Sequence, residues 1–129
     1  SATLHAATLL LSLVENKPVA QRMAASSGAI AAVKQCLQAD PPDADLHLAL
    51  LGVLFQITTQ PEHHEAVLAE GVVSTVLNVM TEAHPTSPDI QVACLTVLAS
   101  LSRKGGTGGR IVQEGALPAV LASMARFPA

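Results

Sequence analysis

The chain has 129 residues, a net charge of −3 and only seven Lys and Arg residues, so it lacks the basic surface that nucleic-acid binding requires. Half of its residues are hydrophobic, and the aromatic ones are limited to two Phe, so Ala, Leu and Val supply most of the apolar volume, which suits close packing of helices. The longest apolar run, Leu48–Phe55, is far shorter than the roughly 18 residues that span a bilayer, and we expect no membrane insertion.

The first predicted helix is the apolar segment Leu4–Val14. No basic segment precedes it, so we interpret it as a helix at the edge of a longer array and not as a signal peptide. A short helix is predicted over 18–26, because Pro18 fits its first turn. Gly28 then ends this helix and allows a tight bend into a middle helix that runs to Leu37.

The same order of elements continues along the chain. A long helix is expected to begin at Asp43 or Asp45 and to end near Thr58, and another begins at Ser87, a capping residue followed by Pro88. Apolar residues at helical spacing fill these segments, and no segment alternates as a strand does. Further short helices are predicted over 61–70 and 110–114, further middle helices up to residues 80 and 124, and proline-rich loops over 39–43 and 84–88.

A period of 43 to 44 residues connects these elements. Gly28, Gly71 and Gly115 are separated by 43 and then 44 residues, and each precedes a similar apolar segment. Pro18 and Pro61 both lie ten residues before a glycine of this series. A period of this length indicates an all-α repeat protein in which neighbouring repeats bury one another's apolar faces.

The segments Ile90–Ser102 and Ile111–Met124 resemble the long third helix and the first–second helix junction of the armadillo repeat, and 49–58 with 67–80 is a weaker match. HEAT repeats are a neighbouring family, but the break at each glycine favours armadillo. The resemblance implies an all-α, right-handed α-solenoid of about three three-helix repeats. It also implies a single domain, 1–129, divided into a third helix (1–16), two repeats (17–59 and 60–103) and the first two helices of a last repeat (104–129).

Armadillo proteins generally bind a protein or peptide along the groove of their third helices. Peptide-binding members place a Trp and, four residues later, an Asn on each third helix. This chain departs from that pattern: Leu9, Gly52 and Thr96 stand at the Trp positions, and Leu13, Gln56 and Ser100 at the Asn positions. We therefore expect a more apolar groove that accepts a helix or a folded partner. The candidate partner-binding residues are Leu48, Gly52, Phe55, Gln56, Thr96, Ser100 and Arg103.

The alternative is a structural or regulatory role, in which the chain docks intramolecularly or self-associates through apolar ends. Leu9, on a helix that is apolar on nearly every side, and Leu117, Val120 and Leu121 near the other end motivate it. Cys36 and Cys94 lie inside apolar helical patterns without CxxC spacing, which predicts buried free thiols in a reducing compartment. The expected location is therefore the cytoplasm, or the nucleus.

Two polar segments invite other interpretations. Residues 103–110 read RKGGTGGR, but they lack the GxxxxGK[ST] pattern of a phosphate-binding loop, so a loop between helices is expected, with an anion contact through Arg103, Lys104 and Arg110 as the alternative. The adjacent His63 and His64 project about 100° apart on a helix and are expected at a solvated helix start, not at a metal.

His5, His47 and His84 are scattered in the sequence and suggest no cluster. We find no nucleophile elbow, no paired carboxylates and no cofactor fingerprint. The sequence therefore predicts a protein that is not an enzyme, with no cofactor and no metal.

Overall fold

The computed structural model describes residues 1–103 and 107–128, and these residues form helices and no strand. The chain is thus all-α over its described part, as the periodicity predicts. In chain order the elements are α1 (Ala2–Val14), α2 (Pro18–Ser26), α3 (Ala29–Gln38), α4 (Ala44–Thr58), the 3₁₀ turn η1 (Pro61–His63), α5 (His64–Ala69), α6 (Val72–Asn78), the π turn η2 (Val79–Ala83), α7 (Pro88–Ser102), α8 (Gly108–Gln113) and α9 (Ala116–Arg126).

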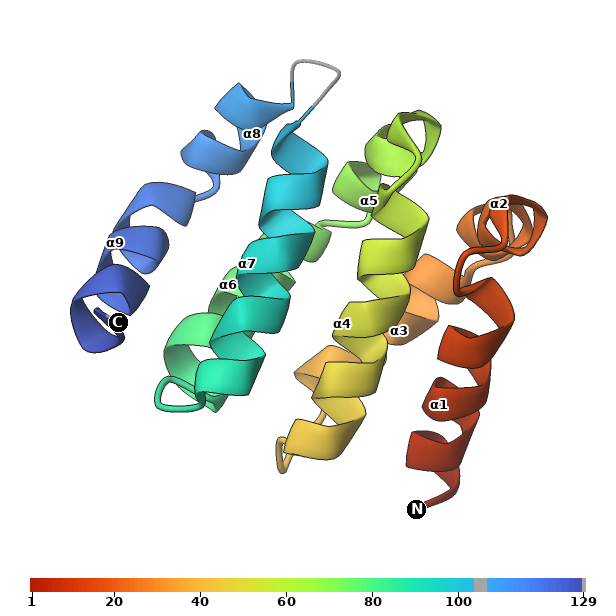
Figure 1. Cartoon of the computed structure of the whole chain (residues 1–129), viewed down its shortest axis with the longest axis horizontal. Coiled ribbons are helices and arrows are strands. Elements are labelled where there is room, and N and C mark those ends of the chain that lie inside the picture. The colour runs from red at the N-terminus through yellow and green to blue at the C-terminus, as the bar shows by residue number, and fades with distance from the viewer. Residues whose placement is uncertain (104–106, 129) are drawn as a thin grey trace.

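The three long helices α1, α4 and α7 lie side by side in one row (Figure 1). Helices α3 and α6 lie behind this row, and the short helices α2, α5 and α8 lie at one end of the long helices. The most extensive packing is that of α4 against α1 on one side and against α7 on the other. The two termini lie at opposite ends of the row, so segments one period apart in the sequence become neighbours in space.

Side-chain caps fix where the long helices begin. Of the two predicted caps of α4, Asp43 has this role, because its carboxylate accepts a hydrogen bond from the Leu46 N–H at 3.1 Å. Ser87 accepts from the Ile90 N–H at the start of α7, and Pro88 occupies the first turn of that helix. The predicted start of α7 is confirmed.

The periodic glycines are the bends between short and middle helices. Gly28, Gly71 and Gly115 have φ angles of 84°, 71° and 98°, and each immediately precedes the next helix. This left-handed conformation costs an L-residue roughly 1–2 kcal/mol, whereas glycine adopts it freely. The prediction that these three glycines permit the bend is confirmed.

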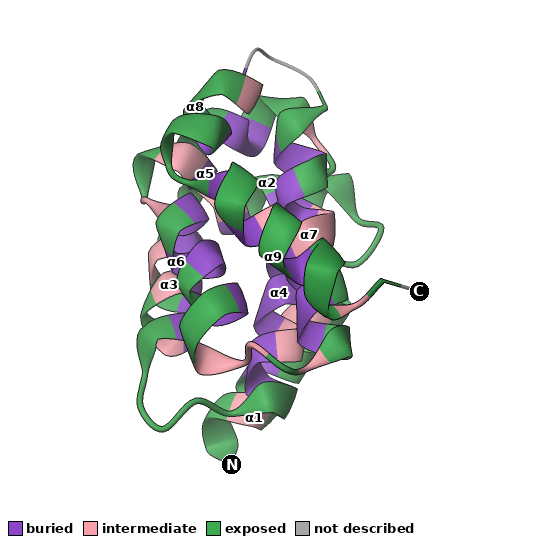
Figure 2. Ribbon diagram, turned by 90° about the vertical axis from the view of Figure 1, so that its left-hand side faces the viewer, coloured by how far each residue is buried: buried purple, intermediate pink, exposed green. Residues whose placement is uncertain are grey.

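The core lies between the row of long helices and the layer behind it. Viewed along the row, the buried parts of the helices face inward and the exposed parts face outward (Figure 2). Leu54, Ile57, Ile90 and Leu101 are among the side chains that are fully buried. Cys94 is also buried, as predicted, whereas Cys36, for which burial was also predicted, is only half-buried.

The second middle helix differs from the single α-helix expected from the sequence. Helix α6 changes at Val79 into a π turn, in which the His84 N–H donates to the Val79 carbonyl at 3.0 Å. The buried residues Val33 and Val76 are 43 residues apart. Cys36 and Met80, whose backbone groups interact with the side chains of His47 and Gln91, respectively, are 44 residues apart. Because a π turn holds one extra residue, it accounts for the local shift of the offset from 43 residues at Val76 to 44 residues at Met80.

Candidate functional site

The predicted partner-binding residues lie on two adjacent long helices. Leu48, Gly52, Phe55 and Gln56 belong to α4, Thr96 and Ser100 belong to α7, and Arg103 follows the end of α7. We call this set the long-helix face. Its members differ in accessibility: Arg103 is exposed, Ser100 is buried, and the other five are half-buried.

Two polar residues of the long-helix face, Gln56 and Ser100, already form hydrogen bonds within the chain. Gln56 Oε1 accepts from the Asn16 N–H at 3.0 Å, and Ser100 Oγ donates to the Thr58 carbonyl at 2.9 Å. Gln56 and Ser100 are 44 residues apart, and both bonds reach the C-terminal end of the preceding long helix. These side chains therefore link successive repeats.

Gly52 has a packing role on the same face. A Cβ atom at this position would lie 3.1 Å and 3.2 Å from the two methyl carbons of Leu11 on α1. The missing side chain thus lets α1 and α4 approach closely, which explains why a small residue occupies this position.

An apolar groove lies between α7 and the C-terminal end of the described chain. Val92 and Leu95 of α7, with Met124 and Phe127, line a cavity of about 520 Å³. Val92 is 64% exposed and Met124 is 62% exposed. Val92 is not among the partner-binding residues predicted from the sequence. The sequence does contain a sign of its exposure, because Val92 is an apolar residue that lies outside the helical stripe formed by the buried residues of α7.

The expected apolar ends are largely accessible. Leu9 and Leu13 of α1 and Leu117 and Leu121 of α9 are all more than half exposed. Val120, which was expected beside them, is half-buried. The positions equivalent to Leu117 and Leu121 one period earlier are Val73 and Leu77, and both of these are buried.

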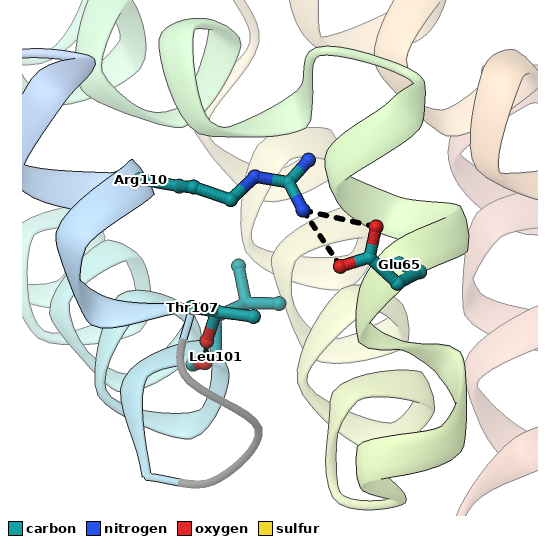
Figure 3. A network of polar contacts seen from close by, with 4 residues as sticks. All are labelled: Glu65, Leu101, Thr107 and Arg110. Carbon is teal, nitrogen blue, oxygen red and sulfur yellow. Dashed lines mark hydrogen bonds and ion pairs between the residues drawn. The ribbon is translucent and has the colours of Figure 1, made fainter.

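Arg110, one of the cations considered for an anion contact, already has a carboxylate partner. Arg110 lies within α8, and its Nη1 binds both carboxylate oxygens of Glu65, at 2.9 Å and 2.6 Å (Figure 3). An anion would therefore have to compete with a carboxylate that is already in place. Arg103 is exposed at the end of α7, and Lys104 lies outside the described residues.

The prediction of a solvated helix start at His63 and His64 is wrong. Both side chains are buried, and His64 Nε2 donates to the Thr58 carbonyl at 2.7 Å. A carbonyl only accepts, so the Nε2 atom carries the proton. The sequence gives no direct sign of this bond, because donor and acceptor meet only after the chain turns from α4 into η1.

His64 belongs to a recurrent position, which we call the short-helix anchor. Its members Gln21, His64 and Thr107 are spaced by 43 residues, and all three are buried. Each donates to a carbonyl near the C-terminal end of the preceding long helix, namely that of Val14, Thr58 and Leu101, respectively. Three different residue types thus fulfil one structural role.

A second recurrent position, the long-helix anchor, lies in the first turn of α4 and α7. Gln91 Nε2 donates to the carbonyl of Met80 at 2.9 Å. His47, 44 residues earlier, is also buried, and the backbone of Cys36, which is 44 residues before Met80, acts to raise the pKa of its ring. Each anchor fastens a long helix to the end of the preceding middle helix.

The expectation that His47 and His84 are isolated is also wrong. His84 Nε2 lies 2.9 Å from His47 Nδ1, and the two rings meet edge to face at a centroid distance of 4.9 Å. Burial lowers the pKa of His47 from its ordinary value, and the charge of His84 lowers it further. Asp43 and the bond to the Cys36 backbone act in the opposite direction.

Within residues 1–103 and 107–128, no group of three or more His, Cys, Asp or Glu side chains is arranged to hold a metal ion. No single helix in this part of the chain has the length and apolar composition to cross a membrane. The segments Pro61–Ala69 and Val72–Ala83 meet that test only when taken together, and they are bent by 76° relative to each other.

Comparisons with protein-family models, curated proteins and solved structures gave no match.

Proposed function

We propose that this chain is a non-catalytic protein–protein interaction module of the armadillo type, a right-handed α-solenoid segment that binds its partner along the long-helix face. The recurrence of short, middle and long helices with a left-handed glycine at each bend supports the armadillo assignment. The negative net charge and the buried thiol of Cys94 suit a protein partner in a reducing compartment, the cytoplasm or the nucleus.

The observation that carries this proposal is the accessible apolar surface beside the long-helix face. Val92 and Leu95 project from α7 into a groove that also contains Met124. Gln56 Oε1 and Ser100 Oγ already form hydrogen bonds within the chain, so an extended peptide would find few hydrogen-bond partners for its backbone on this face. An amphipathic helix or a folded apolar surface is the complementary ligand.

The experiment is affinity capture with the chain, followed by titration of the captured partner against a matched pair of variants. Val92→Glu places a charge in the groove, whereas Val19→Glu places the same charge on α2, where Val19 is 62% exposed. We expect Val92→Glu to weaken binding at least tenfold, the loss of about 1.4 kcal/mol typical of a central interface contact, and Val19→Glu to have no effect. Equal affinities of the two variants would refute this location of the site.

The exposed ends support a second candidate function, self-association. Leu121 on α9 is 61% exposed and Leu9 on α1 is 60% exposed, on opposite ends of the row of helices. If these exposed leucines hold two copies of the chain together, light scattering will show an average mass that rises with protein concentration, and Leu121→Glu will abolish this rise. Met23→Glu, at a position on α2 that is 65% exposed, is the control and should leave the rise intact. A concentration-independent monomer would exclude this function.

A further inference from the structure

The contact between His47 and His84 joins two successive repeats. His47 lies in the first turn of α4, and His84 directly follows the π turn η2, at the start of the 84–87 loop that leads into α7. The rings contact each other directly, with 2.9 Å between His47 Nδ1 and His84 Nε2. His47 is 1% exposed, so its ring cannot turn into solvent without moving α4.

The backbone at His84 is also held in place. Its N–H donates to the Val79 carbonyl at 3.0 Å, and its own carbonyl accepts from Gln91 Nε2 at 3.1 Å and from the Ser87 N–H at 3.3 Å. Neither partner of the pair can therefore withdraw by a simple loop movement. A change in the protonation of the rings acts on the packing of α4 against the 84–87 loop.

The geometry allows the pair to bind one extra proton but not two. A single N–H between the two facing nitrogens makes the hydrogen bond, and an outer ring nitrogen of the pair is left for one further proton. When both rings are protonated, every nitrogen of both imidazoles carries a hydrogen. Two N–H groups and two positive charges then face each other across the 2.9 Å contact.

The charges around the pair do not remove this conflict. Asp43, the cap of α4, favours the charged form of His47, but its carboxylate is already engaged by the Leu46 N–H. On the side of His84, Arg126 of α9 donates to the carbonyl of Pro85 at 2.7 Å and so adds a positive charge near the loop. On the side of α3, the backbone of Cys36 acts to raise the pKa of His47.

We propose that the His47–His84 pair is an acid-sensitive contact between repeats: it is closed at neutral pH and is broken when both rings are protonated, which releases the start of α4 from the 84–87 loop. The next repeat provides the comparison, since Gln91 has the same anchoring role as His47 but does not titrate. The release is thus specific to one junction of the chain.

The test is a pair of measurements on the whole chain between pH 8 and pH 5. NMR titration of the ring protons should give His47 a midpoint below its ordinary 6.5, and His84→Gln, which keeps a hydrogen-bond donor but removes the charge, should raise that midpoint. Urea unfolding should show that the folding equilibrium constant of the wild type decreases below pH 6.5, by up to about tenfold per pH unit for one proton.

The decisive variant is His47→Gln, which places the residue of the equivalent repeat position at the anchor. It should fold, by the same bond that Gln91 makes, and lose the part of the pH dependence that His47 contributes. His64→Gln is the matched control, because Gln21 occupies the position equivalent to His64, and this variant should retain that part. An unchanged pH dependence in His47→Gln, or a His47 midpoint that does not move in His84→Gln, would overturn the proposal.

Discussion

Replacement of Gln91 by Met tests whether the long-helix anchor holds α7 in place. The Gln91 side chain is 4% exposed, and its Nε2 donates to the carbonyls of Met80 and His84, at 2.9 Å and 3.1 Å. Met has nearly the same length and fills the same space, so the substitution removes the two hydrogen bonds without opening a large cavity.

The magnitude follows from what each carbonyl loses. Two hydrogen bonds contribute about 1 kcal/mol each, and a buried acceptor left without a partner adds about 1 kcal/mol or more. His84 keeps its bond from the Ser87 N–H, so the additional penalty applies mainly to Met80. We therefore expect a loss of about 2–3 kcal/mol in the free energy of unfolding, which corresponds to a decrease of roughly 8–12 °C in Tm for a chain of this length.

Urea unfolding followed by circular dichroism measures this loss. Gln91→His is the informative control, because His is the residue of the equivalent position in the preceding repeat and can still donate to the Met80 carbonyl. It should retain at least half of the stability that Gln91→Met loses. If the free energy of unfolding of Gln91→Met is within about 0.5 kcal/mol of the wild-type value, the range of a surface substitution, the anchor does not stabilise the junction.

Three further predictions concern single residues. Gly71→Ala should reduce the free energy of unfolding by roughly 1–2 kcal/mol because its φ is 71°, whereas Gly109→Ala, within a helix and with open space at the Cβ, should not destabilise. Burial raises the pKa of the Cys94 thiol to about 12, so a thiol reagent at pH 8 should label Cys36 rapidly and Cys94 only after unfolding; comparable native rates would contradict this. Arg110→Ala should cost at most about 1 kcal/mol, decreasing with salt, since its ion pair is exposed; a larger, salt-independent loss would contradict that assignment.

The helices and their junctions could be predicted because their signals are local. A capping side chain acts on an N–H three residues away, as Ser87 does on Ile90, and a glycine sets its own backbone angle, as Gly71 does. The period then aligns these signals along the chain. The π turn at Val79 escaped prediction, since one residue inserted into an apolar helix leaves its composition unchanged.

The polar contacts could not be predicted because they join residues that are distant in sequence. His47 and His84 are 37 residues apart, and Gln56 and Asn16 are 40 apart. Their proximity depends on how the helices stack, so a histidine in an apolar helix and one in a proline-rich loop look unrelated in the sequence. The candidate site shows the same division: the sequence indicated a candidate face on α4 and α7, but Val92 became a candidate only when its exposure was known.

The short-helix anchor also bears on how such a chain can diverge and be engineered. An amide, an imidazole and a hydroxyl all donate to the same kind of carbonyl at this position. The junction therefore requires a hydrogen-bond donor there, but it does not require a particular residue type. The unit from residue 60 to residue 103 contains one complete set of helices and one donor of this kind. Tandem copies of that unit would place an identical junction between every pair of neighbours, so the array could be lengthened by one 44-residue module at a time without a new interface having to be designed.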